Sequence, residues 1–174
     1  MSLLKQDLRR YRNIETGKFE WHEPSLINII IYRWGRSIRT IKFKPIRIFI
    51  NIIYTPIFMF FSLFIGIYLP RGARIGGGLK IYHFGSIILN PLSIIGSNYT
   101  LRQGVTIGNR NHVGDVPVIG DNVDFGAGCV VIGAIKIGDN ASIGANAVVL
   151  KDVPENHIAV GVPAKNYPKK NNDK

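Results

Sequence analysis

Four histidines are the side chains best suited to proton transfer near neutral pH: His22, His83, His112 and His157. A neutral imidazole can take the proton of an attacking hydroxyl group, and general-base help of this kind typically accelerates a reaction by ~10²–10⁴. His22 lies in an amphipathic N-terminal segment and His157 follows Pro154 in a turn, so we expect structural or exposed roles for both. No Cys, Asp or Glu is spaced to complete a metal site with any of them, and we expect no metal. His83 and His112 are therefore the candidate bases.

The elements that must position these histidines follow a repeat of six residues. A single apolar residue returns at every sixth position, at Ile95, Leu101, Ile107, Val113, Ile119, Phe125, Val131, Ile137, Ile143 and Val149. A strand would show a period of two and a helix a period of 3.6, whereas a long fixed period indicates a solenoid. Turn-forming residues follow the apolar positions, among them Gly96, Gly108, Gly120, Asn98, Asn122, Asn140 and Asn146. Each hexad therefore predicts a short strand and a tight turn.

Three hexads would form one coil of about 18 residues with a triangular cross-section. Residues 18 positions apart should then stack into columns that form the core. The expected columns are Leu101, Ile119 and Ile137 in one, and Ile107, Phe125 and Ile143 in another.

The two candidate histidines differ in how they relate to this repeat. Leu69, Ile75, Ile81 and Ile87 form an earlier series whose phase differs by two residues from the main run. Two extra residues cannot be absorbed in a stacked coil, so the interval between Ile81 and Leu89 should bulge and lift His83 off the wall. His112 lies in a stretch that keeps strict phase, which argues against a large extrusion there.

The repeat over roughly residues 69–165 resembles the left-handed parallel β-helix of the hexapeptide-repeat acyltransferases. This resemblance implies a mainly β fold carrying an N-terminal α-helical arm. The segment Lys80-Ile81-Tyr82-His83-Phe84-Gly85-Ser86 resembles the serine acetyltransferase segment in which an Asp-His pair precedes a small residue and a glycine. His83 falls on the catalytic histidine of that family. His112 is the second choice, because galactoside and xenobiotic acetyltransferases carry their catalytic histidine in a loop near this place.

The same resemblance implies acetyl-CoA as the acyl donor, bound in a groove between two solenoids of a homotrimer. Ala127 and Ala145 would line the pantetheine arm, while Lys151 and Lys165 would meet the cofactor phosphates as point charges. Small residues also fit tight coil corners, and lysines also occur as ordinary surface charge, so these alternatives stay open.

Several positions depart from the serine acetyltransferase pattern. Tyr82 stands where that family has an aspartate, its orienting aspartate falls at Tyr68, and its Arg-His pair falls at Asp115 and Val116. A bound serine zwitterion would lack counter-charges there, and burying it unpaired would be costly. We therefore expect an O-acetyltransferase that acts on a hydroxyl of a sugar in a surface polysaccharide or its precursor. The alternatives are a serine O-acetyltransferase of cysteine biosynthesis and a β-helix scaffold without catalysis.

The expected organisation is a helical, basic and apolar arm over residues 1–68, a β-helix domain over 69–165 and a flexible tail over 166–174. Helices are expected from Ser2 to Arg12 and again from Glu23-Pro24-Ser25 onward. The net charge of +11 and the pI near 10.0 suggest a nucleic acid as one class of partner. However, residues 1–47 hold 11 Lys and Arg against four Asp and Glu, whereas residues 81–150 hold three against four. No nucleic-acid motif accompanies this charge, so we expect no such partner.

The segment from Ile46 to Leu69 is almost wholly apolar and follows a cluster of Lys and Arg. It could pack against the solenoid or a neighbouring subunit, lie in a membrane interface, or span a bilayer. We expect packing combined with peripheral contact at the inner membrane surface through residues 26–69, because basic residues beside an apolar helix attract anionic lipid. The single Cys129 and the charged N-terminal residues predict a protein of the cytoplasm, without internal disulfides or a cleavable signal.

Overall fold

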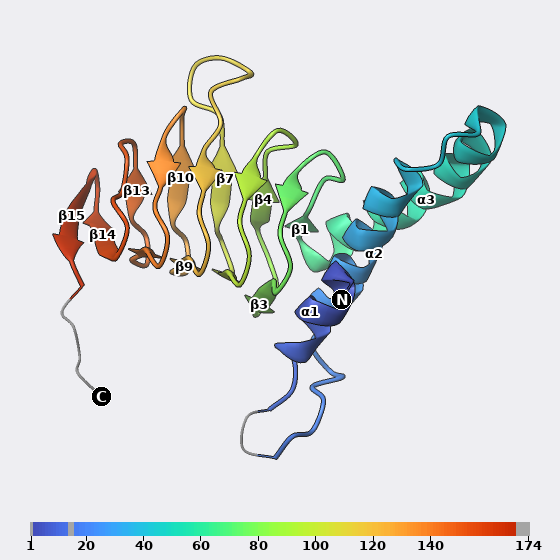
Figure 1. The fold of residues 1–174 in the computed structure, drawn as a ribbon, viewed down its shortest axis with the longest axis horizontal. Helices are drawn as coiled ribbons and strands as arrows, with labels where there is room; N and C mark the ends of the chain where they lie inside the picture. Colours follow the sequence, from blue (N-terminus) through green and yellow to red (C-terminus); the bar gives the residue numbers. More distant parts are fainter. Residues whose placement is uncertain (1, 14–15, 170–174) are drawn as a thin grey trace.

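A computed structural model describes residues 2–13 and 16–169 (Figure 1). The helices are α1 (Leu3–Arg9), α2 (Ser25–Ile38) and α3 (Lys44–Ile65). The strands are β1 (Ile67–Tyr68), β2 (Arg74–Ile75), β3 (Lys80–Tyr82), β4 (Ile87–Leu89), β5 (Ile94–Ile95), β6 (Thr100–Arg102), β7 (Thr106–Gly108), β8 (Val118–Ile119), β9 (Asp124–Phe125), β10 (Val130–Ile132), β11 (Lys136–Ile137), β12 (Ser142–Ile143), β13 (Val148–Val149), β14 (His157–Gly161) and β15 (Ala164–Pro168).

The strands form the three walls of a parallel β-solenoid of about five turns. One wall is the five-stranded sheet β1-β4-β7-β10-β13, the second is the four-stranded sheet β11-β8-β5-β2, and the third is the six-stranded sheet β15-β14-β12-β9-β6-β3. Apart from the final β14–β15 hairpin, successive strands belong to different walls and all strand pairs are parallel. Figure 1 shows the coils side by side with the helices at one end. The predicted solenoid with an N-terminal helical arm is confirmed.

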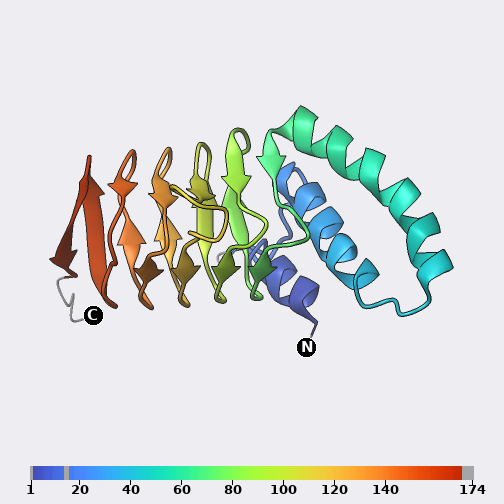
Figure 2. The same ribbon diagram turned by 90° about the horizontal axis from the view of Figure 1, so that it is seen from above.

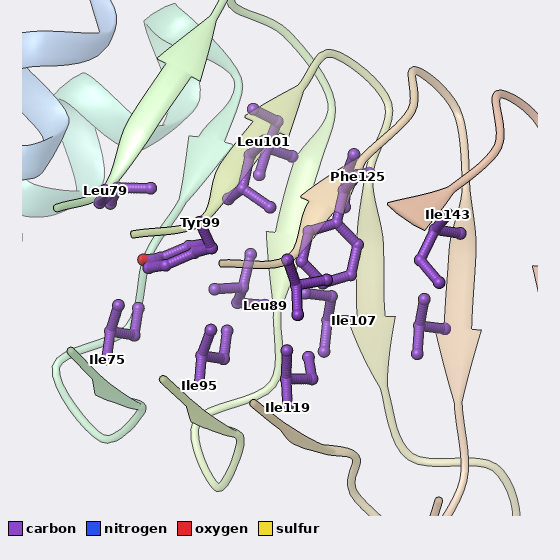
Figure 3. Close-up of a cluster of buried hydrophobic side chains, with 14 of the residues drawn as sticks. Ile75, Leu79, Leu89, Ile95, Tyr99, Leu101, Ile107, Ile119, Phe125 and Ile143 are labelled. Atoms are coloured by element: carbon purple, nitrogen blue, oxygen red, sulfur yellow. The ribbon is translucent and has the colours of Figure 1, made fainter. Parts of the chain in front are cut away.

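The core of the solenoid is formed by the apolar hexad residues (Figure 3). Nine of the ten predicted positions are buried, and Val113 is the exception at 77% exposed. Ile119 pairs in register with Ile137, and Phe125 with Ile143, as expected. The first residue of each expected column was assigned wrongly. Ile107, for example, pairs with Val131 and does not stack on Phe125.

The cause is an extruded loop over residues 109–117, which Figure 1 shows projecting after β7. Ile95 pairs with Ile119 and Ile107 with Val131, so this coil is 24 residues long. Six extra residues leave the coil without changing the phase of the repeat. The expectation of no large extrusion beside His112 was therefore wrong.

The bulge expected near His83 is present. Ile67 pairs with Ile87 and Ile81 with Leu101, both 20 residues apart, whereas Leu89 and Ile107 are 18 apart. The two extra residues therefore lie between Ile81 and Ile87.

The helical arm caps the open end of the first coil. Backbone carbonyls at such an end lack strand partners, and a buried unpaired carbonyl is costly. Polar side chains of α2 supply donors: Asn28 to the Ile67 carbonyl at 2.9 Å and Tyr32 to the Ala73 carbonyl at 2.8 Å. These bonds hold the arm on the solenoid in a fixed orientation.

α2 and α3 form an antiparallel pair in which α3 lies on the outer side (Figure 2). Their contact is a small separate core of Ile31, Ile38 and Tyr54. Both expected N-terminal helices are present, with Ser2 capping α1. The solenoid begins with β1 at Ile67, two residues before the expected boundary at 69. β15 extends to Pro168, so the described start of the expected tail is strand, and residues 170–174 lie outside the described part.

Candidate active site at a corner of the solenoid

His83 lies in the bulged turn between β3 and β4. Its φ of 64° is in the left-handed region, as are the φ of 108° at Gly85 and of 54° at Ser86. Non-glycine residues adopt this region rarely, and such backbones concentrate at functional sites. The His83 and Phe84 side chains are exposed. The turn therefore presents an imidazole outward, as the change of phase predicts.

This turn belongs to a column of turns that we call the His83 corner. It joins the six-stranded to the five-stranded sheet through residues 83–86, 103–105, 126–129 and 144–147. Backbone hydrogen bonds link its levels: Gly104 N–H to the Gly85 carbonyl at 3.0 Å, and Asn146 N–H to the Ala127 carbonyl at 2.8 Å. Ala127 and Ala145 occupy this corner, and both are small and partly or fully exposed. The structure thus brings His83, Ala127 and Ala145 onto one edge.

Lys165 lies near the end of the same edge. β14 adds to the six-stranded sheet beside β12, and β15 folds back on it with Lys165 opposite Val160. The tip of this hairpin follows Gly161, the residue at which β14 ends. The Lys165 side chain is exposed.

A second column of turns, the loop corner, joins the five-stranded to the four-stranded sheet. It consists of residues 69–73, 90–93, 109–117, 133–135 and 150–152, and so holds His112 and Lys151. His112 is exposed, and its backbone N–H donates to Asp115 Oδ2 at 3.1 Å. The two candidate histidines therefore stand at different corners of one solenoid, separated by the five-stranded sheet.

Tyr82, the residue before His83, stands between two cations. Its ring lies 4.9 Å from Lys80 Nζ and 5.7 Å from the Arg102 guanidinium carbon. Lys80 pairs with Glu20 and Arg102 with Asp124, each at 2.7 Å. A tyrosine ring in this setting attracts cations through its π face but carries no charge to orient an imidazolium. Tyr82 therefore does not supply the negative charge of the aspartate that the serine acetyltransferase pattern has at this position.

Within residues 2–13 and 16–169, no three His, Cys, Asp or Glu side chains gather in a way that could hold a metal ion. The expectation that no metal takes part stays a prediction.

The repeat and its relatives agree with this architecture. The family described as bacterial transferase hexapeptide (six repeats) matches residues 117–151. A serine acetyltransferase of Mycobacterium tuberculosis is 40% identical over 108 residues, covering 61% of this chain and 47% of its own. The Escherichia coli K12 protein WcaB, whose name assigns it provisionally to acetyl transfer in colanic acid biosynthesis, is 40% identical over 103 residues, covering 59% and 64%. The chain therefore carries a hexapeptide repeat and is similar in sequence to serine acetyltransferases over about 60% of its length.

Solved structures match this hexapeptide-repeat protein over almost its whole length. A Neisseria gonorrhoeae serine acetyltransferase in complex with serine has a TM-score of 0.75 at 29% identity, covering 95% of this chain and 67% of that chain. A serine acetyltransferase in complex with CoA has a TM-score of 0.79 at 26% identity, covering 95% and 68%. The hexapeptide-repeat protein spans less than two thirds of the length of the two curated relatives above.

One feature of the site was missed from the sequence, namely the extruded loop that carries His112. The signal that could have revealed it is composition. Asn109-Arg110-Asn111-His112 is a polar run, and Val113 is the only large apolar residue between it and Val116. The ion pair of Arg102 with Asp124 was also not foreseen, because it joins neighbouring coils 22 residues apart.

Proposed function

We propose that this chain is an acetyl-CoA-dependent O-acetyltransferase in which His83 is the general base. One observation carries the proposal: a bulge of two residues presents the His83 imidazole outward at a corner that also holds the small residues Ala127 and Ala145. The names of the relatives, which are serine acetyltransferases and a polysaccharide-related acetyltransferase, support this reaction class.

In the proposed reaction, the His83 imidazole takes the proton of the acceptor hydroxyl as its oxygen attacks the thioester carbonyl. A bond forms between the acceptor oxygen and the acetyl carbon, and the carbon–sulfur bond then breaks. The imidazolium returns its proton to the departing CoA thiolate. Backbone N–H groups near the corner would donate to the developing oxyanion, which is a large source of rate enhancement in acyl transfer.

The donor fits the chemistry of the His83 corner. Ala127 and Ala145 leave room beside the backbone for an extended pantetheine arm, and no larger side chain stands at these two positions. The exposed ammonium groups of Lys151 and Lys165 are suited to phosphates. Lys165 lies beside the His83 corner and Lys151 lies at the loop corner, so we propose a homotrimer in which two adjacent solenoids share each site.

For the acceptor we propose a sugar hydroxyl of a surface polysaccharide or its precursor. Tyr68 and Tyr82 stand where the serine-specific pattern would have carboxylates, and the ring of Tyr82 lies beside cations. A serine ammonium group would find no counter-charge at either position. Neutral hydroxyls need no such partner. Acetyl-CoA as donor is consistent with a cytoplasmic location, which is part of the proposal.

Serine is the second candidate acceptor. The specific observation in its favour is that solved neighbours covering 95% of this chain are serine acetyltransferases, one of them in complex with serine. In that case the counter-charges would come from positions other than 68, 82, 115 and 116.

Release of free CoA thiol from acetyl-CoA tests the proposal, measured with purified full-length protein and a panel of acceptors. We expect release above the acceptor-free rate with one or more hexoses, nucleotide sugars or oligosaccharides, and none with L-serine. Release with L-serine alone would retain acetyl transfer and overturn the sugar acceptor. Absence of release with every acceptor, together with no binding of acetyl-CoA by calorimetry, would overturn the enzyme and favour a scaffold.

A further inference from the structure

α3 presents a long apolar face that no described residue covers. Over its 18 most apolar residues the mean hydropathy is 2.2, and only 6% of that window is buried. The outward side chains include Phe49, Ile52, Met59, Phe60, Leu63 and Phe64, each more than half exposed. Exposed apolar patches of this extent mark interaction surfaces.

The opposite face of α3 is already occupied, which fixes the direction of the exposed one. Tyr54 is buried against Ile31 and Ile38 of α2, and Ile50, Ile57, Phe58 and Phe61 pack on the same cluster. Figure 2 shows that α3 lies on the outer side of the pair. The apolar face therefore points away from α2.

Cations gather at the N-terminal end of α3. No Asp or Glu occurs between Glu23 and Asp115, whereas this interval contains Arg33, Arg36, Arg39, Lys42, Lys44, Arg47, Arg71, Arg74, Lys80, Arg102 and Arg110. Among these, the described residues pair only Arg33, Lys80 and Arg102 with carboxylates. The remaining positive charge is concentrated around the α2–α3 turn.

Three of these arginines line one cavity, which we call the arginine pocket. It has a volume of about 400 Å³ and is lined by Ile38, Arg39, Arg47, Asn51 and Arg71. The structure draws the charges together: the guanidinium groups of Arg36 and Arg39 donate to the Arg71 carbonyl at 3.4 and 3.3 Å, and Arg71 donates to Asn51 Oδ1. Like charges held this close favour a phosphate between them.

The cations of the α2–α3 turn lie at the N-terminal end of the apolar helix face. Such a surface is complementary to an anionic bilayer, which is apolar below and phosphate-rich at the headgroup level. A second copy of this chain fits less well, because its apolar face would not supply the anionic groups that the cations at the N-terminal end of α3 attract. A spanning helix fits less well, because α2 and the charged side chains of the α2–α3 turn would have to cross the hydrocarbon with it.

We propose that α3 docks in the plane of an anionic membrane, with its outward apolar face in the interface and the cations of the α2–α3 turn at the level of the lipid phosphate groups. α3 ends at Ile65 and is capped by Gly66, whose carbonyl accepts the Ile87 N–H at 2.9 Å just after the His83 turn. Docking therefore brings the His83 corner to the membrane surface. The proposal does not depend on the reaction proposed above.

Vesicle flotation of purified full-length protein tests this docking, with vesicles of phosphatidylcholine alone and of phosphatidylcholine mixed equally with phosphatidylglycerol. Binding is expected to the anionic vesicles and to fall as salt is raised. The double variant Arg39→Gln/Arg47→Gln should lower that binding roughly thirtyfold. Its matched control is Lys136→Gln/Arg110→Gln, which removes two exposed cations from the solenoid and should leave binding unchanged.

A second pair of variants tests the apolar face. Leu63, 84% exposed on α3, and Val113, 77% exposed on the solenoid, give comparable sites for a change to Asp. Leu63→Asp should lower anionic-vesicle binding about tenfold or more, and Val113→Asp should not. Neither side chain belongs to the core, so both variants should keep the wild-type unfolding temperature.

Several outcomes would overturn docking. Equal binding to neutral and anionic vesicles, or unchanged binding of the double arginine variant, would show that the cations do not contact lipid phosphate groups. No vesicle binding, with stabilisation by inorganic phosphate that the double arginine variant abolishes, would make the pocket a site for free phosphate. No vesicle binding, with Leu63→Asp splitting an oligomer, would assign the face to a second copy. Resistance of membrane-bound protein to alkaline extraction would indicate a spanning helix.

Discussion

Arg33 holds Asp7 by two hydrogen bonds inside the contact between the helical arm and the first coil. Its Nε and Nη2 donate to the two carboxylate oxygens at 2.7 and 3.0 Å, and both side chains are buried. Asp7 also accepts the Leu79 N–H at 2.9 Å, while Arg33 donates to the Ile75 carbonyl at 2.8 Å. The pair therefore joins α1, α2 and the solenoid.

Breaking this pair should destabilise the protein strongly. Asp7→Ala leaves the Arg33 charge buried without its carboxylate, and losses of about 3–5 kcal/mol are typical of such changes. Denaturant unfolding measures the effect. The double variant Asp7→Leu/Arg33→Met removes both charges and should lose less than Asp7→Ala alone; an equal or larger loss would show that the charge pair is not what matters.

The turn residue Asn140 offers a test of the backbone conformation at the coil corners. Its φ is 57°. Its side-chain Oδ1 accepts a hydrogen bond from Asn122 Nδ2 at 3.1 Å, and its Nδ2 donates to Asn156 Oδ1 at 3.2 Å, so these amides form a ladder along the solenoid. Asn140→Gly loses the amide but keeps the conformation, whereas Asn140→Ala also strains the backbone. We expect thermal unfolding to show Asn140→Ala less stable than Asn140→Gly by about 1–2 kcal/mol. Equal stability would contradict a left-handed residue at this turn.

Cys129 should be unreactive in the folded protein. Burial raises the pKa of its thiol from 9.0 to about 12, because the thiolate is disfavoured away from water. At pH 8, Ellman's reagent should therefore react slowly with native protein and release one equivalent promptly in guanidinium, since the chain has one cysteine. The unfolded thiol ionises first as pH rises, so its contribution to stability is complete below pH 9 and is lost between pH 9 and 12. Fast reaction of the native protein would place Cys129 outside the core.

The solenoid was predictable because its core residues recur at a fixed, short spacing in the sequence. Each inward residue follows the previous one at a fixed spacing, so Ile119, Phe125 and Val131 could be assigned to the core from the sequence alone. The bulge at His83 was predictable for the same reason, since two extra residues shift the phase visibly.

The loop that carries His112 was not predictable from phase, because its six extra residues equal one repeat. Val113 therefore occupies a position of the six-residue repeat although its side chain is 77% exposed. The grouping of the site also needed the structure: only the pairing of coils shows that His83 shares a corner with Ala127 and Ala145, whereas His112 does not.

The anchoring of the arm was not predictable from any local pattern. The bond from Leu79 to Asp7 joins residues 72 positions apart, and nothing in the sequence near Asp7 marks it for burial. The sequence predicted the helices and their apolar character, while long-range polar contacts decide where the arm lies.

The most direct test of the account is acetyl-CoA turnover by His83→Asn with the acceptor identified in the panel. Asparagine tolerates the φ of 64° at this position better than alanine does, so the turn should keep its shape. His112→Asn is the matched control in the extruded loop. We expect His83→Asn to lower kcat by ~10²–10⁴ with an unchanged unfolding temperature, and His112→Asn to lower it far less. Wild-type turnover by His83→Asn in folded protein would contradict the proposed general base.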